Sequence, residues 1–269
     1  MKNPETNLES NPEPEISFSD HLIESAISPV HQGRGKLFEI KGNPDKIVRM
    51  ESFEDLEQRY KHDVDPVVIA EEGQKLYAEL EKKYDIAVPV EFLVGKDSKD
   101  NDVIYAIVDK IDGSDLDKIE VTPELTEKVE QLYEAIAQYY LDTVTAGEGI
   151  YLADINDASQ YVYGKKKGDE NPQIYLVDTD LYMRDGPVAL RNVILWLYRH
   201  MCSVEKKYGK KFIRAREIIR QTIAQPLPET VTDEQKTVAK KIIEKTKGYM
   251  DGSVRMDDDD AHPIFSNMD

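Results

Sequence analysis

Two aspartates, Asp154 and Asp178, stand where carboxylates often take part in chemistry. Asp154 lies in a polar loop after a long amphipathic segment, and Asp178 ends a short apolar run, Ile174–Val177. In phosphoryl transfer, one carboxylate holds the acceptor hydroxyl and a second, at a strand end, holds magnesium against the triphosphate. The plainer interpretation stays open, because most loop aspartates serve as helix caps or turn residues.

The segments around these aspartates predict a helix, a loop and a hairpin. Apolar residues recur every three or four positions from Leu125 to Tyr140, and Thr122-Pro123 supplies a cap and a first-turn proline. Two short strands, at Tyr161–Tyr163 and Ile174–Val177, flank a charged turn. Further helical patterns follow over residues 188–205, 211–224 and 232–249.

The earlier half of the chain predicts a small sheet with one helix. Runs in which apolar and polar residues alternate, or that are rich in β-branched residues, indicate strands, and Gly42–Asp45 indicates a turn between two of them. Apolar residues spaced by multiples of four after Pro66 indicate a helix. Ile111–Leu116 is interpreted as a connector in which Gly113 is free to take a positive φ. The predicted strands cover residues 36–41, 45–50, 88–94 and 102–109, and the predicted helix covers residues 66–84.

Charge narrows the range of partners. The 269 residues include 35 Lys and Arg against 53 Asp and Glu, a formal net charge of −18. The averaged field therefore repels nucleic acid and anionic lipid. A nucleotide remains compatible with this charge, because magnesium and a few basic side chains reverse the field within one cleft.

Several features indicate a cytoplasmic protein without a membrane span. Cys202 is the only cysteine, which excludes an intrachain disulfide and fits a reducing compartment. The first sixteen residues have no apolar core and do not form a signal peptide. The most apolar stretch, Val188–Met201, contains charged residues and is too short to cross a bilayer.

Other chemistries have less support. The five histidines show no paired metal-ligand spacing. The chain contains no Gly-x-Ser-x-Gly elbow, no Walker-type loop and no dinucleotide fingerprint after a strand.

From about Gly33 to Leu181 the chain resembles the protein-kinase-like superfamily, including its small bacterial and small-molecule branches. The resemblance lies in the order of elements more than in the identity of motifs. It implies an α+β, two-lobed fold with a small N-terminal antiparallel sheet plus helix and a mainly helical C-terminal lobe. The expected divisions are a disordered arm (1–18), an N-terminal lobe (19–111), a helical lobe (112–250) and an acidic tail (251–269).

The resemblance also implies a nucleotide site in the N-terminal lobe. Gly33 and Gly35 lie where the family's glycine-rich loop covers the phosphates, although two glycines often serve only a turn. Arg49 replaces the family's phosphate-binding lysine, and it could instead decorate an edge strand. Glu72 would be its ion-pair partner, with Glu79 as the alternative register and a solvated helix face as the plainer interpretation.

The hinge and the catalytic loop carry the remaining implied roles. The segment from Asp109 to Ile111 would offer backbone groups to adenine. In the catalytic loop only Asp154 matches the family's motif. Ser159 stands where the family has a metal-binding Asn, and Gln160 could supply an amide oxygen after a one-residue shift, as Asn156 could if the loop is rebuilt.

The resemblance places magnesium at Asp178, with Asp180 as a second carboxylate, and ATP as the nucleotide. It favours an atypical ATP- and magnesium-dependent phosphotransferase that acts on an unknown acceptor. A catalytically inactive pseudokinase, serving as a binding or regulatory module for a protein partner, is the second hypothesis, because the loop motifs are altered. An unrelated α+β adaptor is the third.

Overall fold

The computed structural model describes residues 22–24, 36–53, 65–86, 88, 90–147, 151–152, 154–177 and 186–254. Four predicted site residues, Gly33, Gly35, Asp178 and Asp180, lie outside the described residues. The predicted disordered arm and the acidic tail beyond residue 254 lie outside them too.

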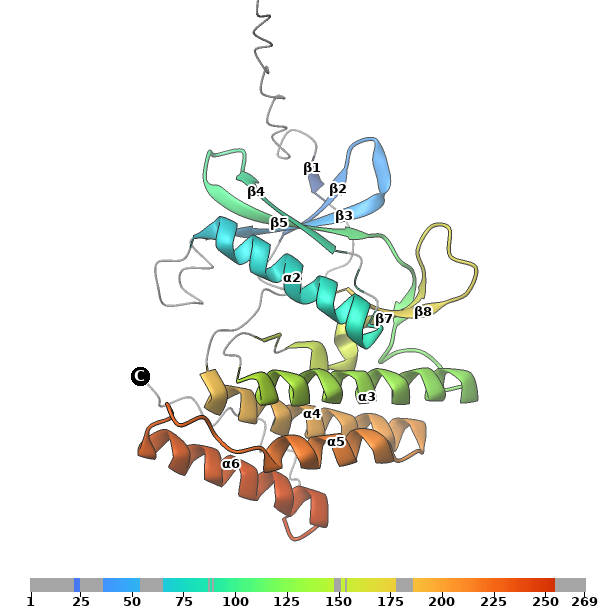
Figure 1. The fold of residues 1–269 in the computed structure, drawn as a ribbon. Helices are drawn as coiled ribbons and strands as arrows, with labels where there is room; N and C mark the ends of the chain where they lie inside the picture. Colours follow the sequence, from blue (N-terminus) through green and yellow to red (C-terminus); the bar gives the residue numbers. More distant parts are fainter. Residues whose placement is uncertain are drawn as a thin grey trace, which may run out of the picture.

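In the described part of the first half, one antiparallel sheet runs in the order β1-β2-β3-β5-β4 (Figure 1). Successive residues of β5 face opposite sides of this sheet. Val103, Tyr105 and Ile107 form a small cluster on one face, whereas Ile104 and Ala106 join the main core on the other. The strands are β1 (Leu22–Glu24), β2 (Lys36–Ile40), β3 (Asn43–Ser52), β4 (Val90–Lys96) and β5 (Asp102–Asp109).

Helix α2 (Pro66–Tyr84) covers the face of the sheet that joins the main core (Figure 1). It begins where the sequence predicts, with Pro66 in the first turn and the Asp65 side chain accepting from the backbone N–H of Val67. It ends at Asp85, whose φ of 56° breaks the helix. Gln74 fastens α2 to β4, because its side chain accepts from the N–H of Phe92 at 3.0 Å.

A second described sheet, in the order β6-β7-β8, corrects the prediction of a simple connector. Asp112–Asp115 forms β6, which pairs with β7 (Tyr161–Lys165), and β7 pairs with β8 (Gln173–Leu176). Gly113 does not take a positive φ. It lies opposite Gly164, and a Cβ added at Gly113 would be 2.4 Å from the Tyr163 carbonyl oxygen, so glycine permits a close backbone approach there.

Helices α3, α4, α5 and α6 stack on the side of α2 away from the sheet (Figure 1). The predicted cap at Thr122 is present, because its side chain accepts from the N–H of Leu125 at the start of α3. At α6, Thr232 and Gln235 form a capping box. No helix in the described part of the chain is long and apolar enough to cross a membrane. The helices are α3 (Pro123–Ala146), α4 (Gly186–Tyr208), α5 (Ile213–Ala224) and α6 (Asp233–Asp251).

A buried ionic network joins α4 to α5. The Glu205 side chain is 1% exposed and accepts from Arg216 Nε at 2.7 Å and from the N–H of Phe212 at 2.7 Å. Arg216 also donates to the Tyr198 hydroxyl at 2.5 Å and to the sulfur of Cys202, which is buried. Burial opposes ionisation of Glu205, but the bonds from Arg216, Phe212 and Lys211 outweigh it and lower the carboxyl pKa.

The protein is therefore α+β, with a small antiparallel sheet in its N-terminal half and a mostly helical C-terminal part. This architecture confirms the predicted α+β class, with a small N-terminal antiparallel sheet plus helix and a mainly helical C-terminal part.

Candidate functional site

The loop that carries Asp154 begins at Leu152 and contains two short 3₁₀ helices, η2 (Asp154–Asn156) and η3 (Ala158–Gln160). Asp154 is exposed at the start of η2. Asp157 caps η3, because its Oδ1 accepts from the N–H of Ser159 at 2.9 Å. The loop thus turns twice within seven residues and presents Asp154 to solvent.

Tyrosine hydroxyls hold the backbone of this loop in place. The N–H of Leu152 donates to the Tyr139 hydroxyl at 3.0 Å, and the Tyr140 hydroxyl donates to the carbonyl of Leu152 at 2.8 Å. Tyr161 donates to the Ile155 carbonyl at 2.7 Å. Since these tyrosines are almost fully buried, their hydroxyls reach the loop from the core.

Sequence reasoning misses this role of the tyrosines. The helical pattern presents Tyr139 and Tyr140 only as members of an apolar stripe. Tyrosines at core positions of a helix are a signal that could have predicted this role. A buried hydroxyl needs a hydrogen-bond partner, and a loop that follows the helix offers backbone groups as partners.

The end of β8 lies beside the end of the Asp154 loop. The N–H of Val177 donates to the carbonyl of Gln160 at 3.0 Å. Asp178 is the next residue along the chain. The structure therefore brings Gln160, one of the predicted metal ligands, next to the residue that precedes the predicted magnesium carboxylate.

The same loop is tied to α4 through Asp157. Nδ1 of His200 lies 3.6 Å from Oδ2 of Asp157. The contact with His200, together with the N–H of Ser159, lowers the pKa of the Asp157 carboxyl to about 2 despite partial burial. Asp157 is therefore ionised at neutral pH and fixes both η3 and the loop's approach to α4.

On β3, Arg49 forms an ion pair with Glu51, with 3.3 Å between the guanidinium and the carboxylate. Both side chains are largely buried, at 13% and 8% exposure. Glu72 is half-buried on α2, and its pairing with Arg49 stays a prediction. Glu79, the alternative partner, contacts Lys83 at 3.3 Å.

The predicted hinge leads directly from one sheet to the other. Asp109, the last residue of β5, pairs with Lys46 at 3.1 Å, and the next N–H, from Lys110, donates to the Asp45 carbonyl at 2.7 Å. Ile111 is half-buried just before β6. Lys167, in the β7–β8 turn, also reaches Asp45 at 2.5 Å, so an ion pair spans the two sheets.

Helix α2 is anchored to α3 through Asp142. Its carboxylate accepts from the Tyr84 hydroxyl at 3.0 Å, from Gln138 at 2.7 Å, and lies 3.0 Å from Lys83 Nζ. Burial of Tyr84, with help from Asp142, raises the pKa of its hydroxyl to about 12. The ring of Tyr84 meets that of Tyr139 edge to face, with centroids 5.5 Å apart.

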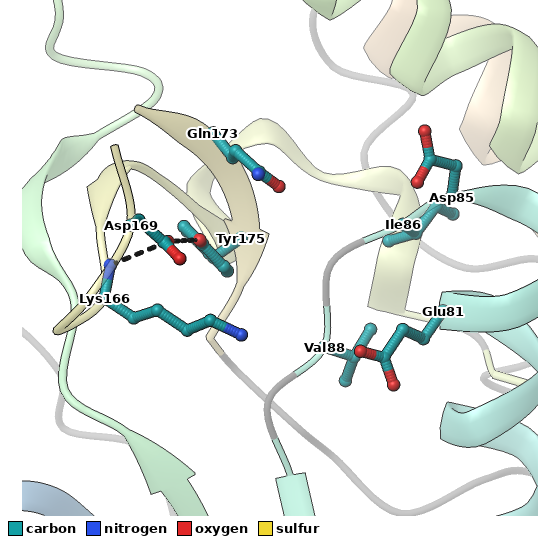
Figure 2. A pocket seen from close by; sticks show the side chains of 8 residues that line it. All are labelled: Glu81, Asp85, Ile86, Val88, Lys166, Asp169, Gln173 and Tyr175. Carbon is teal, nitrogen blue, oxygen red and sulfur yellow. Dashed lines mark hydrogen bonds between the residues drawn. The ribbon is translucent and has the colours of Figure 1, made fainter. Parts of the chain in front are cut away.

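A small cavity of about 130 Å³ lies between the α2–β4 corner and the β7–β8 hairpin (Figure 2). Glu81 and Val88 line one side, and the Lys166 side chain extends toward them from the hairpin. The Asp169 carboxylate accepts from the Tyr175 hydroxyl and from the N–H of Lys166. None of the predicted site residues that the structure describes lines this cavity.

Metal-ligating side chains do not cluster in the part of the chain that the structure describes. No three or more His, Cys, Asp or Glu side chains gather closely enough there to hold a metal ion. Asp178 and Asp180, which carry the magnesium prediction, lie outside those residues. Carboxylate oxygens are the hard donors that magnesium takes, so the residue types fit the predicted ion.

No protein-family model matches the chain, and no curated protein matches it. Among solved structures, WaaP in complex with acyl carrier protein is similar at a TM-score of 0.42 and 13% sequence identity. The match covers 85% of this chain and 90% of that one. A likeness this distant adds no argument about function.

Proposed function

We propose that this chain is an atypical ATP- and magnesium-dependent phosphotransferase. The observation that carries the proposal is the hydrogen bond from the N–H of Val177 to the carbonyl of Gln160. It joins the loop that carries Asp154 to the strand that precedes Asp178. Phosphoryl transfer needs a carboxylate for the acceptor and another for the metal on neighbouring segments.

In this proposal each residue acts on one part of the reactants. Asp154 orients the hydroxyl of an acceptor that is still unknown, and Asp178 with Asp180 holds magnesium. Arg49 contacts the nucleotide phosphates. Magnesium, when bound, offsets the charge of the phosphates. The other assignments are Gly33 and Gly35 over the phosphates, Glu72 toward Arg49, backbone groups of Asp109 and Ile111 at adenine, and Ser159 or Gln160 at a second metal.

The experiment is a calorimetric titration of the protein with ATP, with and without magnesium, beside Asp178→Ala. The proposal expects binding that depends on magnesium and that the variant loses. Asp154→Asn serves as the folded reference that still binds ATP, and both variants must retain the wild-type melting temperature. Absence of binding at millimolar ATP would contradict the proposal.

A second candidate, a pseudokinase that serves as a binding or regulatory module, is favoured by one observation. Arg49 already has a partner on its own strand, Glu51, and both are largely buried. A guanidinium held this way is a poor substitute for a lysine ammonium that must reach phosphates.

The Arg49→Lys variant separates the two candidates. If the chain transfers phosphate, a lysine at this position should raise the rate of ATP turnover, on the order of tenfold or about 1.4 kcal/mol. Glu51→Gln is the matched control, since it alters the pair but adds no ammonium. No turnover in either variant or in the wild type would favour the pseudokinase.

A further inference from the structure

We infer that Tyr139 and Tyr140 are positioning residues for Asp154, an inference that rests on the proposed function. Both come from α3 and both hold the same residue of the loop, Leu152. Neither belongs to the motif by which the chain resembles kinases. Their role would be to fix the backbone from which Asp154 projects.

The two bonds engage both backbone polar groups of Leu152. Its N–H donates to the Tyr139 hydroxyl, and its carbonyl accepts from the Tyr140 hydroxyl. Together they restrain the backbone of Leu152 from two directions. Asp154 follows two residues later, and Tyr161 holds the carbonyl of Ile155 on its other side. The backbone of Asp154 is therefore bracketed by bonds to buried hydroxyls.

The tyrosine rings are themselves fixed. The ring of Tyr139 packs edge to face on Tyr84, and its centroid lies 5.2 Å from that of Tyr140. Tyr84 is held in turn by Asp142. Because packing holds the two rings in place, their hydroxyl oxygens stay in fixed positions. The loop is therefore positioned relative to α3 and, through Tyr84, relative to α2.

These bonds lie in a dry environment. Tyr139 and Tyr140 are 3% and 0% exposed, and Leu152 is 1% exposed. Burial raises the pKa of both hydroxyls, so both stay neutral over the range in which ATP is assayed. Water cannot easily replace a lost hydroxyl at such a site, so its removal leaves a backbone group of Leu152 without its partner.

The test compares Tyr139→Phe and Tyr140→Phe with Tyr208→Phe. Tyr208 is a matched control, because it is 8% exposed and its hydroxyl has no hydrogen-bond partner within the described residues. The rate of amide hydrogen exchange over residues 152–156 measures how firmly the tyrosine hydrogen bonds restrain the backbone of the loop. ATP turnover and ATP affinity, measured with magnesium on the same samples, report its consequence.

In Tyr139→Phe we expect exchange of the Leu152 amide to accelerate roughly tenfold, as the loss of one buried hydrogen bond implies. Tyr140→Phe should lower kcat by a similar factor, while the Kd for ATP stays within about twofold because the proposed function places adenine at the hinge and not at this loop. Tyr208→Phe should leave exchange and kcat unchanged. If the tyrosines had a purely structural role, exchange and kcat would instead change in all three variants in proportion to the change in melting temperature.

Two results would overturn the inference. One is exchange over residues 152–156 that is the same in Tyr139→Phe as in Tyr208→Phe. The other is accelerated exchange with kcat unchanged in both loop-holding variants. A wild-type protein with no ATP turnover would contradict the proposed function instead, and the exchange data would then still show whether the tyrosines hold the loop.

Discussion

The five-stranded sheet and the helical part secure their polar groups in different ways. Around the sheet, Lys46 pairs with Asp109 and Lys110 with Glu39 at the surface, although the Arg49–Glu51 pair on β3 is largely buried. In the C-terminal part, Glu205 and the tyrosines that hold the Asp154 loop make hydrogen bonds that are almost fully buried. Salt screens surface ion pairs strongly and buried pairs much less. The Asp154 loop should therefore be the rigid half of the proposed site, and the sheet with its hinge the adjustable half.

The largest effect is expected from Arg216→Ala in the helical part. The change leaves the Glu205 carboxylate buried without its guanidinium, which costs about 3–5 kcal/mol of unfolding free energy. Arg214→Ala is the control, because Arg214 is 56% exposed and its pairs with Glu134 and Glu217 lie at the surface. Urea denaturation of both variants measures the difference. Equal losses of unfolding free energy in the two variants would contradict the expected difference between buried and surface ion pairs.

A smaller effect is expected at the junction between the halves. Gly164→Ala would place a Cβ 2.4 Å from the carbonyl oxygen of Asp112, so β6 and β7 must separate. Overpacking of this kind costs about 1–3 kcal/mol. Ser114→Ala, on the exposed side of β6, is the control and should change the melting temperature little. A wild-type melting temperature in Gly164→Ala would show that the two strands are not closely paired.

Acid should weaken the Asp157 contact. The folded-state pKa of this carboxyl is about 2, below its unfolded value, so the stability it adds is present above pH 4 and is lost as the pH falls toward 2. Because the side chain is 39% exposed, we expect only about 1 kcal/mol. The difference in unfolding free energy between wild type and Asp157→Asn, followed from pH 6 to 2, should shrink over that window. A constant difference would rule out the contact as its source.

The smallest effect is expected at the ion pair that spans the two sheets. Lys167→Ala removes the contact with Asp45, and because Lys167 is 77% exposed the loss should be about 0.5 kcal/mol at low salt. In about 1 M sodium chloride the difference should vanish. Lys99→Ala, also exposed, controls for the loss of one positive charge. If the loss of unfolding free energy persists in high salt, this ion pair is as weakly screened as the buried bonds of the helical part.

The elements with strong local signals were predicted well. Pro66, Pro123 and the cap at Thr122 define the starts of α2 and α3, and the β-branched run of β5 has the predicted bounds. The strand β6 was missed because Asp112-Gly-Ser-Asp115 has little strand propensity of its own. It exists because β7 pairs with it, and such long-range pairing leaves no local trace in the sequence.

The candidate site was less accessible to sequence reasoning. The ion pair of Arg49 with Glu51 joins residues two apart on one strand, which lie on the same face, so it could have been predicted once the strand was assigned. The hold of Tyr139 and Tyr140 on Leu152 could not, because it depends on how the loop returns over α3.

If Asp154 lies at a phosphotransfer centre, its carboxylate is needed for ATP turnover, which can be measured in Asp154→Asn with magnesium present. In that case the wild type releases or transfers the γ-phosphoryl group, and the variant does so at least about a hundredfold more slowly with ATP affinity retained. A wild-type protein that turns over no ATP, or a variant as fast as the wild type, would contradict this role of Asp154.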